Sequence, residues 1–490
     1  MIFVSKTHII VAKSGLRLTR GVAGLEPFVP TAKRPWDAKL AGHLLRRAVF
    51  GPQPGEIATA AGMTLEKVVD QLLADVSPPA PPGDWVSEPP FRSPTPEQQQ
   101  TNQDRMNTMR FWWANLMLAQ GISLRERMVL FWHNHFATEA KAVQFPQIMY
   151  TQNQTLRQHA LGNVKDLVMA ITRDPAMLVY LDGRLNRVGS PNENYARELL
   201  ELFTLGVNNY TQNDVAEAAR ALTGWTVSGL QAEFQPRRFD IGTKTFLGRT
   251  GAFNDTDVVD IIFDQWQAAV FLCRKLYRAF VYHEPDEAVV VEMADILREN
   301  KYEIKPVLRK LLLSDHFFDE TTIGAQIKSP IDLIIGTVRG LNVPQVSPVY
   351  LTGFAGLLEQ TLLDPPNVAG WPGYHTWIST STLPQRNAFV DELLDGKPRQ
   401  IYRQRFTFPA FDVLSFAKSF PAPNDAVALV KDLTQALLGI PIGEGQREVF
   451  LNALLQGAAV YDWSITDPRA GDRLKALLRM MLKLPEYQLT

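Results

Sequence analysis

Carboxylates, asparagines and an arginine gather in the segment GSPNENYARELLELFTLG, residues 189–206. Glu193, Arg197 and Glu201 recur every four residues, so on a helix they form one ladder of alternating charge. We expect this helix to begin at Ser190, with Glu193 closing a capping box. One interpretation of this ladder is a solvated helix face. Carboxylates held by an arginine beside a helix N-terminus could also bind a divalent cation or a polar ligand. The other polar residues here are Asn192, Asn194 and Glu198.

A second segment, residues 123–138, contains the tripeptide His-Asn-His. On a regular helix His133 and His135 point about 200° apart, so they cannot share one ion. His135 falls within the apolar stripe of this helix. It is therefore either a core histidine with a backbone or carboxylate partner, or a site residue. If the helix unwinds at Trp132, both histidines could serve one site.

A third segment, DPPNVAGWPGYHTWIST at residues 364–380, is predicted to be a loop by its prolines and glycines. Flat aromatic faces beside amides suit sugar rings or aromatic ligands. The alternative is a buried loop whose tryptophans fill the interior. The residues of this loop that could bind a ligand are Asn367, Trp371, Tyr374, His375 and Trp377.

The elements that must position these residues are almost all helical. Apolar residues recur at three- and four-residue spacings through most of the chain, whereas alternation with a period of two is nearly absent. Residues 233–247 are the exception and predict a short two-stranded ribbon. We therefore expect a mostly α fold: a large multi-helical body with a small β-ribbon and a proline-rich surface linker.

Composition shifts divide the chain of 490 residues. Residues 1–34 carry six basic side chains and one acidic one, which indicates a basic extension or a remnant export leader. Residues 35–389 are expected to form the helical body. Within it, eight prolines in residues 77–96 predict an exposed linker, and residues 363–384 form the aromatic loop. Residues 390–490 are expected to add helices packed on the body.

Several function classes are disfavoured by composition alone. The chain has 50 basic and 51 acidic side chains and no basic stripe typical of nucleic-acid binding. Cys273 is the only cysteine, so an intramolecular disulfide and a cysteine-based metal cluster are excluded. No apolar run approaches the roughly 18 residues of a transmembrane helix. The sequence also lacks a nucleophile elbow, a P-loop and a dinucleotide fingerprint.

Seven segments carry a resemblance to a known family. They are HLLRRAVFGPQPGEI (43–57), FWHNHFAT (131–138), TRDPAMLVYLDG (172–183), SPNENYARELLELFTLGVNNYTQNDVAEAARALTGW (190–225), KTFLGRTGAFN (244–254), IKSPIDLIIGTVRGL (327–341) and PPNVAGWPGYHTWIST (365–380). Together they resemble the bacterial domain-of-unknown-function 1800 family. The resemblance implies a mostly helical bacterial protein, frequently exported and often encoded beside a sulfatase-like partner. The chain departs from the family in having no clean leader sequence.

The polar residues of the family-defining segments are the candidates for a functional site, and we expect them to converge on one cleft. As catalytic residues we expect Glu193, Glu198, Glu201 and His135. As substrate-binding residues we expect Asn192, Asn194, Arg197, Asn367, Trp371, Tyr374, His375 and Trp377.

Three functions fit these residues. The first is an exported enzyme acting on a polysaccharide or another envelope polymer, with carboxylates as acid and base or as ligands of a divalent metal. The second is a non-catalytic binding or assembly partner of a sulfatase-like protein. The third is a metal or haem oxidoreductase centred on His135, which the small number of histidines and their spacing disfavour.

Overall fold

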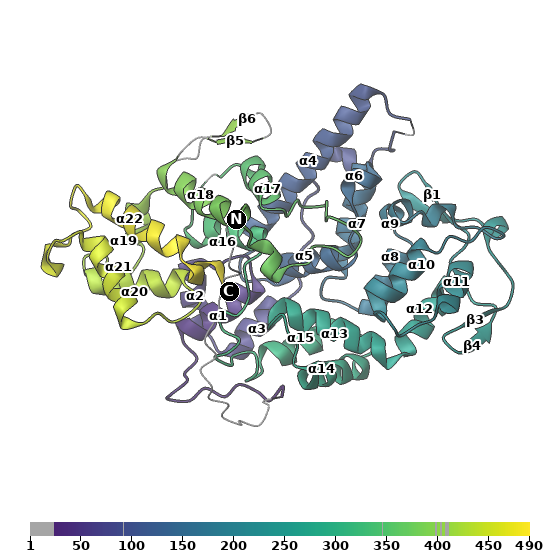
Figure 1. The fold of residues 1–490 in the computed structure, drawn as a ribbon, viewed down its shortest axis with the longest axis horizontal. Coiled ribbons are helices and arrows are strands. Elements are labelled where there is room, and N and C mark those ends of the chain that lie inside the picture. The colour runs from purple at the N-terminus through teal and green to yellow at the C-terminus, as the bar shows by residue number, and fades with distance from the viewer. Residues whose placement is uncertain (1–23, 92, 345, 397–398, 402–403, 407–410) are drawn as a thin grey trace, which may run out of the picture.

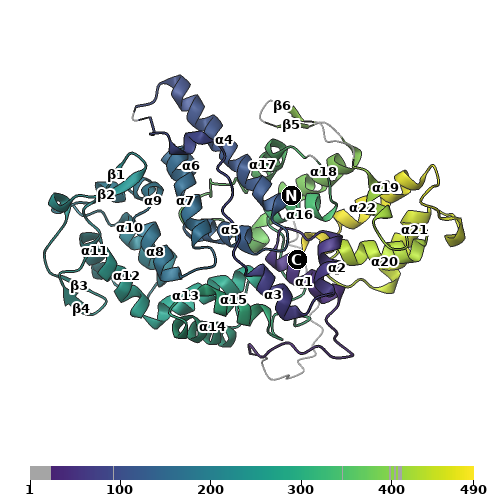
Figure 2. The ribbon, with the colours of Figure 1, turned by 180° about the vertical axis from the view of Figure 1, so that it is seen from behind.

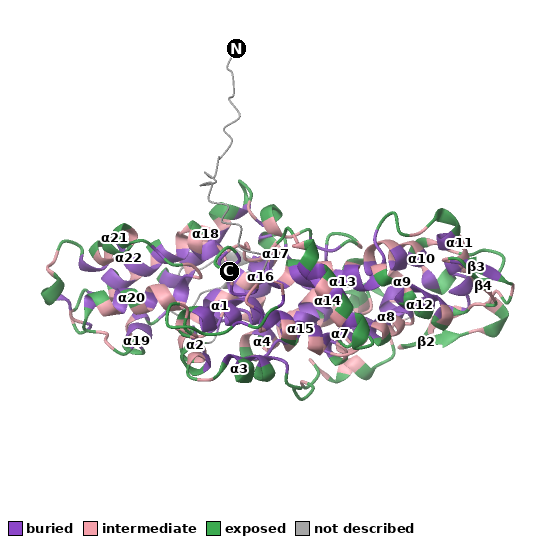
Figure 3. Cartoon of the chain, turned by 90° about the horizontal axis from the view of Figure 1, so that it is seen from below, coloured by how far each residue is buried: buried purple, intermediate pink, exposed green. Residues whose placement is uncertain are grey.

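The computed structural model describes residues 24–91, 93–344, 346–396, 399–401, 404–406 and 411–490. In these parts of the chain helices greatly outnumber strands, which confirms the predicted mostly α fold. Figure 1 shows an elongated body, with residues 225–251 at one end and the C-terminal helices at the other. Figure 3 shows buried residues along the whole length of this body.

The first part of the body consists of helices with strong start signals. Asp37 caps the first helix by accepting from the amides of Lys39 and Leu40. Thr95 and Gln98 form a capping box at the start of the 24-residue helix α4. The helices are α1 (Ala38–Ala48), α2 (Pro54–Ala61), α3 (Leu65–Leu72), α4 (Pro96–Ala119), α5 (Arg125–His135), α6 (Ala140–Val143), α7 (Pro146–Gln158), α8 (Val164–Thr172) and α9 (Pro175–Tyr180).

The proline-rich linker between α3 and α4 contains one short 3-10 turn, η1 (Asp84–Ser87), and no α-helix in its described residues. Its prolines explain this, because they remove amide donors and block helix formation. The linker is not detached from the body. The indole of Trp112 on α4 donates to the carbonyl of Ala80 at 2.8 Å.

The central part contains α10 (Asn194–Glu198), the π-helix η3 (Leu199–Thr204), α11 (Gln212–Ala221), α12 (Asp255–Asp264), α13 (Trp266–Phe280), α14 (Glu287–Glu299) and α15 (Ile304–Leu312). The C-terminal part contains α16 (Pro330–Gly340), α17 (Pro348–Leu357), η5 (Tyr374–Trp377), α18 (Thr382–Asp395), α19 (Val413–Lys418), α20 (Ala426–Leu437), α21 (Glu444–Leu455), α22 (Ala470–Lys483) and η7 (Pro485–Gln488). Figure 2 shows α20 beside α1. None of the helices in the described residues is long and apolar enough to cross a membrane.

The β structure differs from the expected single ribbon over 233–247. Strand β1 (Trp225–Ser228) pairs with β2 (Gln231–Phe234), and β3 (Lys244–Phe246) pairs with β4 (Arg249–Gly251). Residues 235–243 therefore separate two hairpins. The second hairpin turns at Leu247 and Gly248, which both have positive φ, as a tight type I′ turn requires. A third hairpin joins β5 (Arg399–Ile401) and β6 (Gln404–Phe406).

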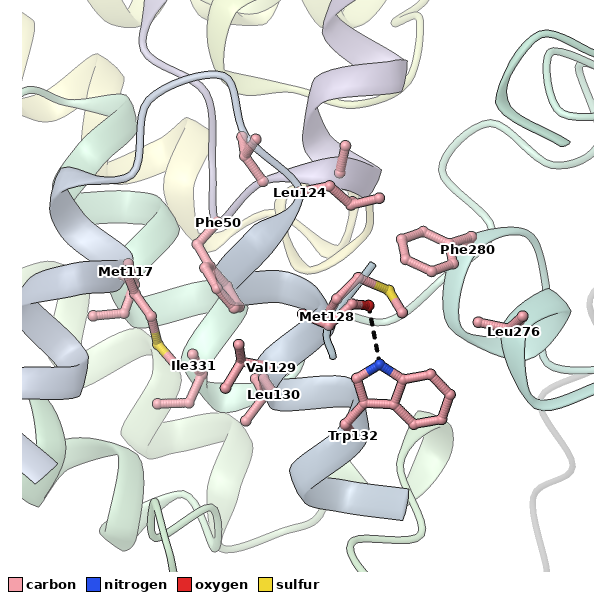
Figure 4. Close-up of a cluster of buried hydrophobic side chains, with 14 of the residues drawn as sticks. Phe50, Met117, Leu124, Met128, Val129, Leu130, Trp132, Leu276, Phe280 and Ile331 are labelled. Carbon is pink, nitrogen blue, oxygen red and sulfur yellow. Dashed lines mark hydrogen bonds between the residues drawn. The ribbon is translucent and has the colours of Figure 1, made fainter. Parts of the chain in front are cut away.

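Helix α5 runs through the core and carries the His-Asn-His segment at its end. Figure 4 shows its apolar side chains packed on one side near Phe50 and Ile331 and on the other near Phe280. Trp132 is fully buried, and its indole nitrogen donates to the carbonyl of Ala160 at 3.1 Å. A buried indole that keeps its hydrogen bond fixes the orientation of the helix end.

Candidate functional site

His133 lies between two tryptophans at the end of α5. Its ring centroid is 5.4 Å from that of Trp113 and 5.7 Å from that of Trp371. Only 1% of the residue is exposed, and Nε2 has no hydrogen-bond partner in the described part of the chain. Burial lowers the pKa of His133 to about 3, so the ring is neutral at physiological pH.

Asn134 attaches the aromatic loop to this helix end. Its side-chain oxygen accepts from the backbone amide of Trp371 at 2.7 Å, and its side-chain nitrogen donates to the carbonyl of Trp371 at 3.4 Å. Gly370 has a φ of +80°, and a Cβ there would lie 2.4 Å from Asn134 oxygens. The close approach therefore requires glycine. Two of the three segments that carry candidate site residues, 123–138 and 364–380, meet at this point.

His135 lies in the core among aromatic rings. Its Nε2 is 3.0 Å from the carbonyl oxygen of Phe203, and its Nδ1 has no partner among the described residues. Burial and the charge of Lys275 hold the pKa of His135 well below its usual range. Of the two interpretations that the sequence leaves open, this geometry fits the core histidine with a backbone partner.

The π-helix η3 makes the contact between His135 and the carbonyl oxygen of Phe203 available. Within its last turn, the carbonyl oxygens of Leu202 and Phe203 are reached by side chains from other helices, Lys275 at 3.2 Å and His135 at 3.0 Å. Burial lowers the pKa of Lys275 to about 8. π-Helical turns are rare and frequently mark functional sites. Here the turn connects the segment 190–206 to α5 and α13.

The expected helix start at Ser190 is wrong. Ser190 pairs with Arg187 in an isolated β-bridge, and α10 begins at Asn194. The side chain of Asn192 accepts from the backbone amide of Asn194 at 2.9 Å. This local bond to the backbone competes with an earlier helix start, as asparagine side chains commonly do.

Glu193 is consequently a surface residue and not part of a capping box. Its carboxylate accepts from Arg197 at 2.9 Å and from Gln212 at 2.8 Å. The side chains of Glu193 and Arg197 are 39% and 38% exposed. This half of the ladder is therefore a solvated helix face.

Glu201 leaves the ladder because it lies within the π-helix. Its carboxylate accepts from the hydroxyl of Tyr210 at 2.6 Å. Glu198 lies between Glu193 and Glu201 in the sequence and has no hydrogen-bond partner among the described residues. Burial and the nearby charge of Glu201 raise the pKa of Glu198. Among the described residues, neither carboxylate makes a hydrogen bond to residues 133–138 or 367–377, so no direct hydrogen bond joins these carboxylates to the other two segments.

Carboxylates in or directly beside these segments act on Tyr180, which the sequence did not single out. The Tyr180 hydroxyl donates to Glu139 at 2.6 Å, and the other oxygen of Glu139 is 2.8 Å from the ammonium of Lys141. Burial raises the pKa of Tyr180, and the charges of Glu139, Glu198 and Asp364 raise it further. We call Glu139, Tyr180, Glu198 and Asp364 the carboxylate cluster.

The two glutamates of the carboxylate cluster lie in different environments. Burial opposes ionisation of Glu139, but hydrogen bonds from Lys141 and Tyr180 outweigh it and lower the pKa of Glu139. The pKa of Glu198 is raised. Two carboxyl groups whose pKa values are pushed apart can act as a proton donor and an ionised partner.

A cleft of about 1140 Å³ adjoins this cluster, and we call it the α4 cleft. Residues of α4, α6 and α17 line it, and so do Lys141 and Asp364, where it borders the cluster. Eight of its eighteen lining residues carry amide or hydroxyl side chains: Gln99, Asn102, Gln103, Asn107, Thr108, Gln144, Thr352 and Thr361. Asn102 is 8% exposed, and its side-chain oxygen has no partner in the described residues.

The remaining loop residues do not line the α4 cleft. Trp371 and Trp377 are buried, so they fill the interior and form no open platform. Asn367 is exposed and accepts from the amide of Ala369 within a turn.

Tyr374 is half-buried and His375 is exposed. Tyr374 stacks on His283 at 4.3 Å, and its hydroxyl is 3.2 Å from that of Tyr282. Burial and this hydrogen bond raise the pKa of Tyr374 to about 12. In the described part of the chain no three His, Cys, Asp or Glu side chains are grouped to hold a metal ion.

Of the residues in the carboxylate cluster, the sequence singled out Glu198; Glu139, Tyr180, Asp364 and the α4 cleft were not predicted. The available signals were the position of Glu139 directly after FWHNHFAT, that of Asp364 directly before PPNVAGWPG, and the amides of α4.

The family model described as "Protein of unknown function (DUF1800)" matches residues 43–489. No curated protein and no solved structure gives a significant match.

Proposed function

Because the chain belongs to the DUF1800 family, whose description states no activity, we propose a function from the site itself: hydrolysis of a polysaccharide bound in the α4 cleft. The observation that carries the proposal is the carboxylate cluster, with its two unlike glutamates, at the border of a large amide-lined cleft. Glycoside hydrolysis requires such a pair of carboxyl groups in different protonation states.

The lining of the α4 cleft suits a neutral polyhydroxylated polymer. Each amide side chain both donates and accepts hydrogen bonds, which matches the hydroxyl groups of sugars. The charged lining residues balance, two of each sign: Asp104, Arg110, Lys141 and Asp364. Small-molecule pockets measure roughly 300–1,000 Å³, so a cleft of about 1140 Å³ has room for several units of a chain.

The two glutamates take different roles in the proposed reaction. Glu198, whose pKa is raised by burial and by the charge of Glu201, donates a proton to the leaving glycosidic oxygen. Glu139, which Lys141 and Tyr180 hold ionised, stabilises the developing positive charge or activates water. We further propose that the protein is exported, which would give it access to such a polymer. Fractionation of cells with an antibody against the chain tests this, and retention in the cytosol would contradict it.

Binding and hydrolysis by the purified protein test the proposal together. Affinity electrophoresis through gels containing neutral polysaccharides should retard the wild-type chain, and the retarding polymer should yield new reducing ends. Gln103→Ala, in the α4 cleft, should weaken retardation, whereas Gln100→Ala should not, because Gln100 is an exposed amide of α4 outside the cleft. If no polymer retards the protein, or if both variants behave alike, the α4 cleft is not the binding site.

A further inference from the structure

Two of the seven segments that carry the family resemblance, 43–57 and 327–341, contribute no residue to the carboxylate cluster and line one small pocket. Arg46 and Gly51 come from the first segment, and Lys328, Asp332 and Gly336 come from the second. The pocket has space of about 30 Å³. This is about twice the space that one water molecule requires.

Close backbone packing fixes the wall of this pocket. Gly51 has a φ of +68°, and a Cβ there would lie 2.3 Å from the Cα of Gly336. Neither the conformation nor the contact tolerates a side chain at residue 51. The pocket is therefore shaped by the backbone of the α1–α2 turn and of α16.

Positive charge dominates around the pocket. Five cationic side chains, Arg46, Arg47, Arg127, Lys328 and Arg386, influence one another or the carboxylate of Asp332, which lines the pocket together with Thr490. That carboxylate is already engaged, because it pairs with Arg127 at 2.5 Å and accepts from Ser329 at 2.8 Å.

Two of these cations face the pocket with unused donors. The ammonium of Lys328 lies 3.8 Å from the ring centroid of Tyr487 and, among the described residues, makes no ion pair within 4 Å and no hydrogen bond, although the charge of Asp332 acts on it. Arg46 donates through Nη2 to the carbonyls of Gln435 and Ala436, and its Nε and Nη1 have no acceptor in the described part of the chain. Burial and the charge of Arg46 lower the pKa of Lys328 to about 7.

We propose that this pocket binds one small oxyanion, a phosphate, sulfate or carboxylate group, held by Lys328 and Arg46. Partly buried cations without a counter-charge are costly, and an anion removes that cost. The space suits one such group and excludes a sugar or a nucleotide base. The site is independent of the proposed polysaccharide hydrolysis, because none of its residues belongs to the carboxylate cluster or the α4 cleft.

Isothermal titration of the full chain with inorganic phosphate tests this proposal. At constant ionic strength, phosphate, sulfate or acetate should bind saturably with a stoichiometry of one, and chloride should not. Acetate binding would identify a carboxylate site, and binding of phosphate or sulfate alone would identify a tetrahedral-anion site. Lys328→Gln should weaken binding at least tenfold, whereas Lys431→Gln, at an exposed position of α20, should leave it unchanged.

Two results would overturn the proposal. The first is that none of the three anions binds saturably. The second is that wild type and K328Q bind the anion with equal affinity. The comparison of these anions with chloride uses the wild-type chain alone. It therefore decides the question even if K328Q does not fold.

Discussion

His133 should make the protein lose stability in acid. Its pKa falls from the ordinary 6.5 to about 3 in the fold because the ring is buried. A histidine with a lowered folded-state pKa contributes stability that is complete above pH 6.5 and is lost as the pH falls toward 3. At pH 5 the unfolded chain is protonated there and the folded chain is not. At about 1.4 kcal/mol per pH unit, the loss at this pH is about 2 kcal/mol.

Replacing the ring isolates this contribution. His133→Phe keeps an aromatic ring between Trp113 and Trp371 and removes the titrating group. Urea unfolding at pH 7.5 and pH 5.0, followed by circular dichroism, should show the loss of unfolding free energy between the two pH values shrinking by about 2 kcal/mol. His375→Phe, at an exposed position, is the matched control and should retain the wild-type loss. If H133F and wild type lose the same unfolding free energy between pH 7.5 and pH 5.0, the assignment of acid sensitivity to the buried ring is refuted.

Three further outcomes follow from the fold. Glu126→Gln should lower the unfolding free energy by about 3–5 kcal/mol, because it breaks a buried pair with Arg157 at 2.9 Å; urea unfolding measures this, and a loss below 1 kcal/mol would contradict it. Gly370→Ala should destabilise the fold and detach the loop from Asn134, seen as a red-shifted tryptophan emission, whereas an unchanged spectrum and melting temperature would argue against the close approach. Limited proteolysis should cut first within residues 77–96, and initial cleavage elsewhere would count against an exposed linker.

The helical fold was predictable from the sequence because three- and four-residue spacings of apolar residues act locally. The position of one helix start was not. Ser190, Pro191 and Glu193 match a capping box in type and spacing. The side chain of Asn192 nevertheless offers the backbone a competing bond, and α10 begins at Asn194. The sequence contains both signals and does not state which one is stronger.

The charge ladder beginning at Glu193 and the carboxylate cluster were predictable only in part. A helical wheel at 100° per residue predicts that Glu193, Arg197 and Glu201 share one face, but the π-helix changes the register at Leu199, and Glu201 contacts Tyr210 instead. Glu139 and Tyr180 are 41 residues apart in sequence, and packing of α9 against α6 brings them together. The α4 cleft likewise depends on contacts between distant helices that no local pattern reports.

The most direct test of the proposed hydrolysis compares two glutamates of the same helical segment. On the polysaccharide that binds the wild-type chain, Glu198→Gln should lower kcat by about 100-fold or more while binding persists, since the general acid is lost. Glu193→Gln should retain nearly full activity, because Glu193 contacts only Arg197 and Gln212 on the partly exposed helix face and lies outside the carboxylate cluster. Unchanged kcat in E198Q, or an equal loss in E193Q, would contradict the assignment of Glu198 as the proton donor.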